Sequence, residues 1–242
     1  MRVSLCLIVF DEVVGCRADV PNLPKDCFHE IYAVDGGSTD GTVEYLTTQG
    51  IPVHRQPKRS LNAAYAHAVA LCKTEGLVIF FPKGTLDPAC CRTMAEKLAD
   101  GFELVVAGRN LPEGTNEEDS HFLKPRKWGV ATLAQLTSLV WRREGTRIHD
   151  VLHGVKAFTV GAYRRMQISD FGVTIDLEMT VRAYRLRIPR TEFPVVETKR
   201  LYGKSGFPIF KTGRRLGWFL LKEIFRRPPR VLPNRLESEI ST

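Results

Sequence analysis

The stretch 30–42 constrains the fold of this chain more than any other segment. A short apolar run, Ile31–Val34, stops at Asp35, and two glycines then lead through Ser-Thr-Asp to Thr42. We predict a strand that ends at the carboxylate, a tight turn, and a helix capped by Asp40 or by the threonine before it. Because glycines let the backbone approach a flat ligand closely, the acid at the strand end could accept hydrogen bonds from ring N–H or ribose hydroxyl groups. An ordinary strand-to-helix turn explains the same residues equally well.

Short apolar strands alternate with amphipathic helices along the first half of the chain, and the alternation continues less regularly after a polar loop at Asn110–Ser120. This pattern is typical of an α/β domain whose mostly parallel sheet is covered by helices on both faces. We predict strands at Val3–Val9, Ile31–Val34, Val53–Arg55, Leu77–Phe81, Leu104–Ala107, Val155–Thr159 and Thr191–Val196. We predict helices at Thr42–Thr48, Asn62–Lys73, Pro88–Leu98, Trp128–Arg142 and Asp176–Tyr184.

Size and composition are those of a folded domain. The 242 residues are enough for one α/β domain with a sizeable core, and the chain is 43% hydrophobic and 26% charged. No apolar run has transmembrane length and no secretory signal pattern is present, so we expect a protein of the reducing cytoplasm. The six cysteines show neither Cys-x-x-Cys pairs nor the spacing of zinc ligands, so we expect no zinc site.

Basic residues concentrate in the C-terminal part of the chain. Between Lys199 and Arg235 there are eleven Lys and Arg residues and one acid, Glu223, whereas the net charge of the whole chain is +8. We therefore predict two units: an α/β domain at 1–198 and a basic segment at 199–242 that faces an anionic partner. Since no helix-turn-helix, zinc or aromatic-platform motif accompanies the basic segment, we predict no nucleic-acid binding.

The segment from Arg214 to Arg227 has the pattern of an amphipathic helix. Its bulky apolar residues are predicted to share one wide face, with basic residues on the opposite side and Phe219 as an exception. A basic helix with aromatic residues on its apolar face can lie in a membrane interface, where anionic lipids contribute about 1 kcal/mol per basic residue. The alternative is a helix that docks on the rest of the domain with its charges outward. The apolar residues are Leu216, Trp218, Leu220, Leu221, Ile224 and Phe225, and the basic ones are Arg215, Lys222 and Arg226.

The run Asp-Gly-Gly-Ser-Thr-Asp-Gly-Thr at 35–42 resembles the Asp-Asp-Gly-Ser-x-Asp-Gly-Thr signature of family 2 glycosyltransferases, with Gly36 in place of the second Asp. Further segments are similar to those of the polyprenyl-phosphate branch of that family, which includes dolichol-phosphate mannose synthase, and they follow in the same order. The resemblance implies a GT-A fold and an inverting transfer of a sugar from a nucleotide-sugar to a polyprenyl phosphate. The segments are 5–12, 104–110, 149–158, 175–178, 193–195 and 200–205.

The same resemblance assigns the donor side of the site. It implies that Asp35 and Glu12 hold the nucleoside of a UDP- or GDP-linked sugar, and that the diphosphate lies at the segment after the strand Leu77–Phe81. The donor-binding residues implied are Phe10, Asp11, Glu12, Asp35, Gly36, Lys83 and Gly84.

The chain departs from the family at the metal site. The family places Asp-x-Asp after the strand corresponding to Leu77–Phe81, but here the sequence is Phe-Pro-Lys-Gly, and Asp87 further on is a poor replacement. Because Mg²⁺ and Mn²⁺ need hard oxygen ligands and the usual carboxylates are missing, we predict no cofactor, with Mg²⁺ or Mn²⁺ as the alternative. In one interpretation the Lys83 ammonium takes the place of the cation in a metal-independent transferase. In the other, the nucleotide site has decayed and the protein is a catalytically silent binding module.

The acceptor side follows from phosphate chemistry and from position in the matched segments. A phosphate nucleophile is largely dianionic at neutral pH, since its second pKa is about 6, so it needs positioning and charge compensation more than a general base. We predict that Arg200, Lys204 and Ser205 hold it, with Arg126 as a further candidate. Asp150 is predicted to be the catalytic carboxylate, which orients the acceptor or steadies positive charge at the sugar C1. The alternative role of Asp150 is a loop cap.

These expectations together describe a transferase that is peripheral on the cytoplasmic face of a membrane. Its predicted partners are a nucleotide-sugar, a polyprenyl phosphate, an anionic membrane surface and, because the family's optional transmembrane helices are absent, a membrane protein. A transferase that uses a soluble acceptor is the remaining alternative, and its activity would not depend on the helix at 214–227.

Overall fold

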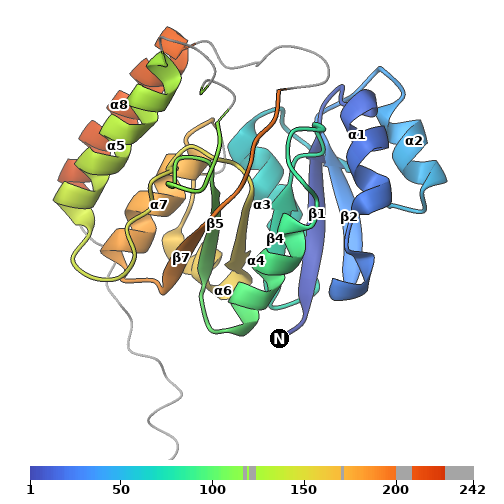
Figure 1. The fold of residues 1–242 in the computed structure, drawn as a ribbon, viewed down its shortest axis with the longest axis horizontal. Coiled ribbons are helices and arrows are strands. Elements are labelled where there is room, and N and C mark those ends of the chain that lie inside the picture. Colours follow the sequence, from blue (N-terminus) through green and yellow to red (C-terminus); the bar gives the residue numbers. More distant parts are fainter. Residues whose placement is uncertain (117–118, 120–123, 170–171, 200–208, 227–242) are drawn as a thin grey trace, which may run out of the picture.

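The computed structural model describes residues 1–116, 119, 124–169, 172–199 and 209–226. Within these residues, seven strands form one sheet in the order β3-β2-β1-β4-β6-β5-β7 (Figure 1). Strand β6 is antiparallel to β4 and β5, and the other neighbouring strands are parallel. The strands are β1 (Val3–Val9), β2 (Glu30–Asp35), β3 (Val53–Arg55), β4 (Gly76–Phe80), β5 (Leu104–Gly108), β6 (Lys156–Thr159) and β7 (Arg190–Pro194).

Helices cover both faces of the sheet. On one face α1, α2 and α4 contribute to a hydrophobic cluster, and on the other α3, α5, α6, α7 and α8 contribute to a second. The helices are α1 (Val13–Asp19), α2 (Thr42–Thr48), α3 (Leu61–Leu71), α4 (Cys90–Ala99), α5 (Pro125–Trp141), α6 (Val160–Met166), α7 (Ile175–Arg185) and α8 (Ile209–Phe225). Two short 3-10 helices, η1 (Val20–Asn22) and η2 (Lys25–Cys27), follow α1.

Strand β1 lies between β2 and β4, and all seven of its residues are buried. Leu5 and Leu7 join one hydrophobic cluster and Cys6 and Ile8 join the other, as the two-residue period of a strand requires. The chain runs from β1 outward through β2 to β3 and then returns to place β4 on the other side of β1. In open α/β sheets, ligands bind in the crevice at the carboxyl ends of the strands where the strand order reverses. The edge formed by the ends of β1 and β4 is therefore the place to look for a site.

The structure confirms the predicted α/β class and the mostly parallel sheet. The bounds of β1, β3 and α2 match the predicted ranges, and the other predicted elements are shifted by a few residues. Helices α1 and α6 were not predicted. Each has seven residues, about two turns, so a 3.6-residue period hardly emerges from the sequence. Helix α2 has the same length and was predicted from the glycine turn and the capping residues before it.

Helix α8 docks on the domain, as the alternative interpretation of this segment predicts. Leu216, Leu220 and Glu223, spaced four and three residues apart, are buried, and Glu223 accepts a hydrogen bond from Arg185 of α7 at 2.9 Å. Of the apolar residues predicted to share one wide face, only Leu216 and Leu220 are buried, and the others are exposed. The exposed apolar residues are Trp218, Leu221, Ile224 and Phe225.

None of the helices in the described part of the chain combines the length and the apolar character that crossing a membrane requires.

Candidate active site

The loops that follow β1 and β2 are tied to each other by hydrogen bonds between side chains and backbone. Asp11, in the left-handed region at φ 49°, donates its backbone N–H to Ser38 Oγ at 2.9 Å, and its carboxylate accepts the N–H of Thr39 at 2.8 Å. Glu12 donates its backbone N–H to Thr42 Oγ1 at 3.0 Å. The predicted donor residues Asp11 and Glu12 are therefore held against the turn that contains Asp35.

Asp40 joins the beginnings of two helices. One carboxylate oxygen accepts the N–H of Val13, at the start of α1, and the other accepts the N–H of Thr42, at the start of α2, both at 3.0 Å. Burial acts to raise the pKa of Asp40, but the hydrogen bonds from Thr42 and Val13 outweigh it and lower the pKa. Gly41 stands at the N-cap of α2 without a side-chain cap bond, so the predicted cap by Asp40 or Thr39 is wrong in position. Asp40 instead holds the N–H of the first residue of each helix, and its contact with α1 was not predicted.

Asp35, at the end of β2, closes the turn that follows it. Its carboxylate is 3% exposed and accepts the N–H of Gly37 at 2.8 Å and the hydroxyl of Ser38 at 2.5 Å. Gly37 has a φ of +96°, which favours glycine, so the tight turn explains this residue. The N–H of Ser38 also donates to both carboxylate oxygens at 3.1 Å, so the turn engages both oxygens, and binding of a nucleoside by Asp35 stays a prediction.

Gly36, where the related signature has its second Asp, makes room for Phe10. A Cβ at Gly36 would lie 3.1 Å from Phe10 Cδ2, and the guanidinium of Arg59 covers the Phe10 ring at 3.8 Å from its centroid. Arg55, at the end of β3, lies next to Gly37. The sequence analysis did not assign Arg55 and Arg59 to the site. Arg55 ends a predicted strand and Arg59 follows that strand, whose carboxyl end lies at the same edge of the sheet.

The loop after β4 packs tightly on α1. A Cβ at Gly15 would lie 2.3 Å from the carbonyl oxygen of Pro82, so only glycine permits this approach. Gly84 donates its N–H to the carboxylate of buried Asp19 at 2.8 Å. Burial raises the pKa of Asp19 to about 6, while the Gly84 N–H acts to lower it and the charge of Asp87 to raise it. Helix α1 thus fixes the loop that carries Lys83.

Phe81 links this loop to the turn that contains Asp150. The Lys83 ammonium lies over the Phe81 ring, 4.9 Å from its centroid. The edge of the Phe81 ring lies against Gly154, where a Cβ would lie 2.7 Å from Phe81 Cε2. The structure therefore brings together Lys83 and the turn at 150–154, which the sequence analysis assigned to the diphosphate and to the reaction centre.

Asp150 is fully buried and paired with Arg109. Arg109 donates Nε to one carboxylate oxygen at 2.7 Å and Nη2 to the other at 3.0 Å, and its Nη1 donates to Glu197 at 3.2 Å. Burial acts to raise the pKa of Asp150, but the Arg109 charge and hydrogen bonds outweigh it and lower the pKa to about 2. A bidentate pair of this kind fixes the guanidinium plane as well as its charge. The sequence analysis predicted Asp150 but missed Arg109 and Glu197.

Two buried groups support the Asp150 turn. Glu192 of β7 accepts the backbone N–H of His149 at 2.7 Å and of Asp150 at 2.8 Å. Lys156, with no exposed surface, donates to the carbonyl of His153 and to Asp176 at 2.6 Å. Because these contacts come from β7, β6 and α7, the turn is held from several sides.

His153 is buried in the same turn and is neutral. Its Nδ1 donates to the carbonyl oxygen of Ala107, at the end of β5. Burial, together with the nearby Arg109 charge, lowers the pKa of His153 to about 3. His153 therefore fixes the turn to β5 rather than adding a charge to the site.

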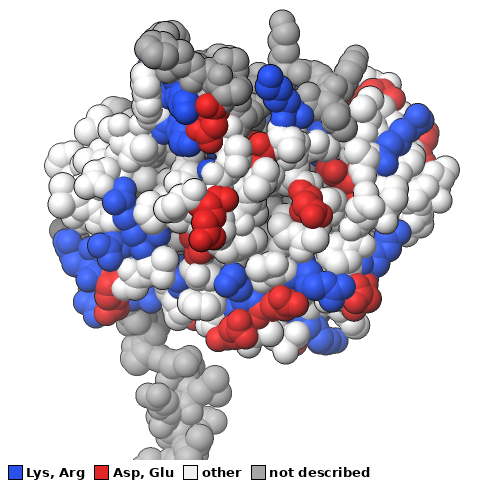
Figure 2. Space-filling model, in the orientation of Figure 1, with Lys and Arg blue, Asp and Glu red and all other residues white. Residues whose placement is uncertain are grey.

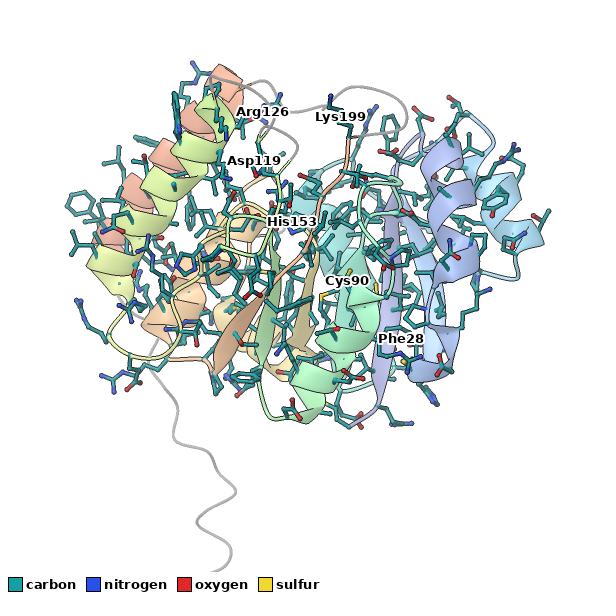
Figure 3. All side chains as sticks on the ribbon, viewed as in Figure 1. Phe28, Cys90, Asp119, Arg126, His153 and Lys199 are labelled. Atoms are coloured by element: carbon teal, nitrogen blue, oxygen red, sulfur yellow. The ribbon has the colours of Figure 1, made fainter. Side chains whose placement is uncertain are left out.

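The remaining predicted acceptor residues are placed only in part. Arg126 is exposed in the first turn of α5, toward the same end of the molecule as His153 and Lys199 (Figure 3). Thr198 donates its N–H to the carbonyl of Thr85 at 2.8 Å, so the chain passes the β4 loop shortly before Lys199. Arg200, Lys204 and Ser205 lie outside the described residues.

The residues of this edge do not fit a divalent cation. In the part of the chain that the structure describes, no group of three or more His, Cys, Asp or Glu side chains is arranged to hold a metal ion. Two carboxylates near the β4 loop hold backbone instead: Asp19 of α1 accepts the N–H of Gly84, and exposed Asp87 accepts the N–H of Ala89 at 2.8 Å.

Comparisons with known proteins agree with this architecture. The model of the family described as Glycosyl transferase family 2 matches residues 15–169. Glycosyltransferase AglJ of Haloferax volcanii is 26% identical over 234 residues, which cover 93% of this chain and 72% of AglJ.

Among solved structures, glucosyl-3-phosphoglycerate synthase from Mycobacterium tuberculosis has the same fold. Its complex with Mn²⁺, UDP and glucosyl-3-phosphoglycerate gives a TM-score of 0.67 at 15% identity, covering 91% of this chain and 79% of that one. Its complex with Mn²⁺, UDP and phosphoglyceric acid gives 0.70 at 14% identity, covering 93% and 79%. At this identity the likeness shows the fold alone.

The family match spans more than half of the chain and includes the loops after β2 and β4 and the turn at Asp150. The expected GT-A fold is confirmed by the solved structures. The chain belongs to glycosyl transferase family 2, and it is a glycosyltransferase that uses a nucleotide-sugar donor.

Proposed function

We propose that the protein transfers the sugar of its nucleotide-sugar donor to a polyprenyl phosphate at the cytoplasmic face of a membrane. The observation that carries the proposal is the outward surface of α8, which joins exposed apolar side chains to basic ones on a helix that is anchored to the domain. The similarity of segments 149–158 and 193–195 to the polyprenyl-phosphate branch supports the same acceptor class.

The outward surface of α8 is unusual for a helix that is already docked. Trp218, Leu221 and Phe225 are 60%, 52% and 85% exposed, although the opposite row of the helix is buried. Lys222 lies beside them, with its ammonium 5.4 Å from the centroid of the Trp218 ring, and Arg215 is exposed nearby in the helix. Bulky apolar groups flanked by cations suit the boundary between lipid headgroups and acyl chains.

Helix α5 adds further exposed apolar surface. Trp128, Leu136 and Leu139 are exposed, and Leu139 reaches 75%. Both α5 and α8 pack on α7, and both contribute to the same hydrophobic cluster. Arg142 and Arg143 directly follow α5 in the sequence. Figure 2 shows basic side chains gathered on this side of the molecule, with acidic ones among them. Together these features support a membrane-facing side on the α5–α7–α8 part of the domain.

The proposed reaction needs no proton transfer. An oxygen of the acceptor phosphate attacks C1 of the sugar, the bond from C1 to the diphosphate breaks, and its electron pair leaves with the nucleoside diphosphate. The lowered pKa of Asp150 keeps this carboxylate ionised, so it is suited to orient Arg109 rather than to act as a base. Three of the five guanidinium donors of Arg109 are engaged by Asp150 and Glu197, which leaves donors for an acceptor phosphate.

The test is sugar transfer from a panel of UDP- and GDP-sugars to a polyprenyl phosphate in detergent. We expect a glycolipid product with the phosphate and none with the corresponding polyprenol, because the phosphate oxygen is the nucleophile. Phosphoglyceric acid serves as a soluble acceptor in parallel reactions. Transfer to the soluble acceptor without transfer to the polyprenyl phosphate would contradict the proposal and would assign a soluble substrate.

A further inference from the structure

We propose that this glycosyltransferase binds the diphosphate of its donor without a divalent cation, and that the Lys83 ammonium provides the positive charge. The inference rests on the donor half of the proposed function and is independent of the acceptor. It concerns the loop after β4, which lies at the carboxyl edge of the sheet beside β1, where the strand order reverses.

The first argument is the chemistry of the loop. A structure with the same fold holds UDP together with Mn²⁺, and such an ion takes carboxylate oxygens as ligands. Here the four residues after β4 are Phe81, Pro82, Lys83 and Gly84, which bring no carboxylate and one cation. An ammonium in this position would repel a divalent ion, and it would attract a diphosphate.

The second argument is the engagement of the carboxylates at this edge. Those of Asp11, Asp35 and Asp40 accept backbone N–H groups of the loops after β1 and β2. That of Asp19 accepts the N–H of Gly84, and burial raises its pKa to about 6, which weakens it as a ligand because metal ligands must be deprotonated. Asp150 is committed to Arg109. These carboxylates therefore hold the loops of the site in place, and their oxygens are already engaged by protein groups.

The third argument is that the loop is held in a fixed place. Gly15 allows α1 to approach Pro82 so closely that a side chain at residue 15 would collide with the backbone of the loop. The N–H of Gly84 is held by Asp19, and the N–H of Lys83 donates to the carbonyl of Phe81 at 2.9 Å. A backbone that is fixed on both sides of Lys83 limits where its ammonium can reach.

The fourth argument is the position of the ammonium relative to the reaction centre. Lys83 lies over one part of the Phe81 ring, and the edge of that ring abuts Gly154 in the Asp150 turn. The charge is therefore next to the place where the bond from the sugar to the diphosphate breaks. A fixed cation there stabilises the negative charge that develops on the leaving diphosphate. Lysine does this as a compact point charge, as it does in other phosphate sites.

The test is calorimetric titration of UDP and GDP into the protein, with EDTA or with Mn²⁺, without any acceptor. We expect the preferred nucleotide to bind as tightly in EDTA as in Mn²⁺. Lys83→Ala should weaken binding of the diphosphate by about tenfold or more, because it removes one charge-assisted contact. It should leave binding of the corresponding monophosphate unchanged, and Lys83→Arg should retain most of the affinity. The control is Lys73→Ala, which removes an exposed lysine just before the amino end of β4.

Wild-type binding that requires Mn²⁺ would overturn the inference. Equal affinities of Lys83→Ala and Lys73→Ala would also overturn it, as would failure of both nucleotides to bind under either condition. Metal-independent binding combined with no transfer to polyprenyl phosphate would leave the inference intact and would contradict only the proposed acceptor. Thermal unfolding of each variant shows whether a lost affinity reflects a lost fold.

Discussion

Asp19 and Asp150 are both buried aspartates at the same edge of the sheet, yet their surroundings shift their pKa values in opposite directions. Asp150 meets the guanidinium of Arg109 in two hydrogen bonds, and its pKa falls to about 2. The carboxylate of Asp19 accepts the N–H of Gly84, but this bond does not offset the effect of burial, and the pKa of Asp19 rises to about 6. A neighbouring cation thus decides which acid can contribute a permanent negative charge and which acid exchanges a proton near neutral pH.

The raised pKa of Asp19 predicts a stability change between about pH 4 and pH 6. Below its ordinary pKa of 3.8 the carboxyl is protonated in both the folded and the unfolded chain. As the pH rises toward 6, the unfolded chain loses this proton first, so the free energy of unfolding falls by up to about 3 kcal/mol. Asp19→Asn keeps an acceptor for Gly84 and should remove this loss, so the variant should gain stability relative to wild type from pH 4 to pH 7.

Urea unfolding of the wild type and of Asp19→Asn at pH 4 and pH 7 measures the effect. The difference between their free energies of unfolding at each pH removes the contribution of the other titrating groups. Asp100→Asn, at an exposed position after α4, is the matched control. A free-energy difference between wild type and Asp19→Asn that is the same at pH 4 and pH 7 would contradict the assigned pKa.

At the residue scale, the sequence predicts the ends of strands better than the partners of side chains. Asp35 and Asp150 were predicted as site residues because each stands in a recognisable local pattern. Arg109 was not assigned to the site, since its partners Asp150 and Glu197 are 41 and 88 residues away along the chain. Those contacts depend on β5 lying between β6 and β7, an order that no local pattern reveals. The sequence signals were the position of Arg109 two residues after a predicted strand and its place in segment 104–110, which resembles a family segment.

At the scale of elements, burial and periodicity predicted the sheet well because its central strands are buried on both faces. The same rules missed α1, whose central Gly15 lowers helix propensity and is explained only by the approach of Pro82 from the β4 loop. They also failed to divide the apolar residues of α8 into two rows. Apolar character alone does not show whether a side chain meets the core or the solvent.

The two rows of α8 predict opposite effects for the same substitution at adjacent positions. Leu220 is 6% exposed and packs in the core, so Leu220→Ala should lower the free energy of unfolding by about 2 to 5 kcal/mol. Leu221 is 52% exposed, so Leu221→Ala should change it by only about 0.5 kcal/mol or less. Urea unfolding measures both.

The variants Leu220→Ala and Leu221→Ala also distinguish the row of α8 that packs on the domain from the row proposed to contact lipid. If the outward row meets lipid, Leu221→Ala should reduce co-sedimentation with anionic liposomes while the fold stays intact. A stability loss that is larger for Leu221→Ala than for Leu220→Ala would contradict the way α8 is docked.

At the scale of the whole molecule, charge and apolar surface are separated from the site in a way that suits a lipid substrate. The donor residues lie at the carboxyl edge of the sheet, whereas α5, α7 and α8 form the part of the domain beyond β6 in the sheet order (Figure 1). The net charge of +8 arises mainly from the C-terminal residues, which include α8. A surface that is both basic and apolar predicts membrane binding with two distinguishable components.

Co-sedimentation with liposomes separates these components through their salt dependence. Binding should be strong with anionic liposomes at low salt and weak with zwitterionic ones, and added salt should weaken it because the Debye length falls. Lys222→Ala should reduce the affinity about fivefold at low salt and less at high salt, since one basic residue near an anionic surface contributes about 1 kcal/mol. Trp218→Ala should reduce it at every salt concentration, because insertion of the ring is apolar. Lys73→Ala should have no effect, and binding insensitive to both salt and lipid charge would contradict a basic membrane surface on α8.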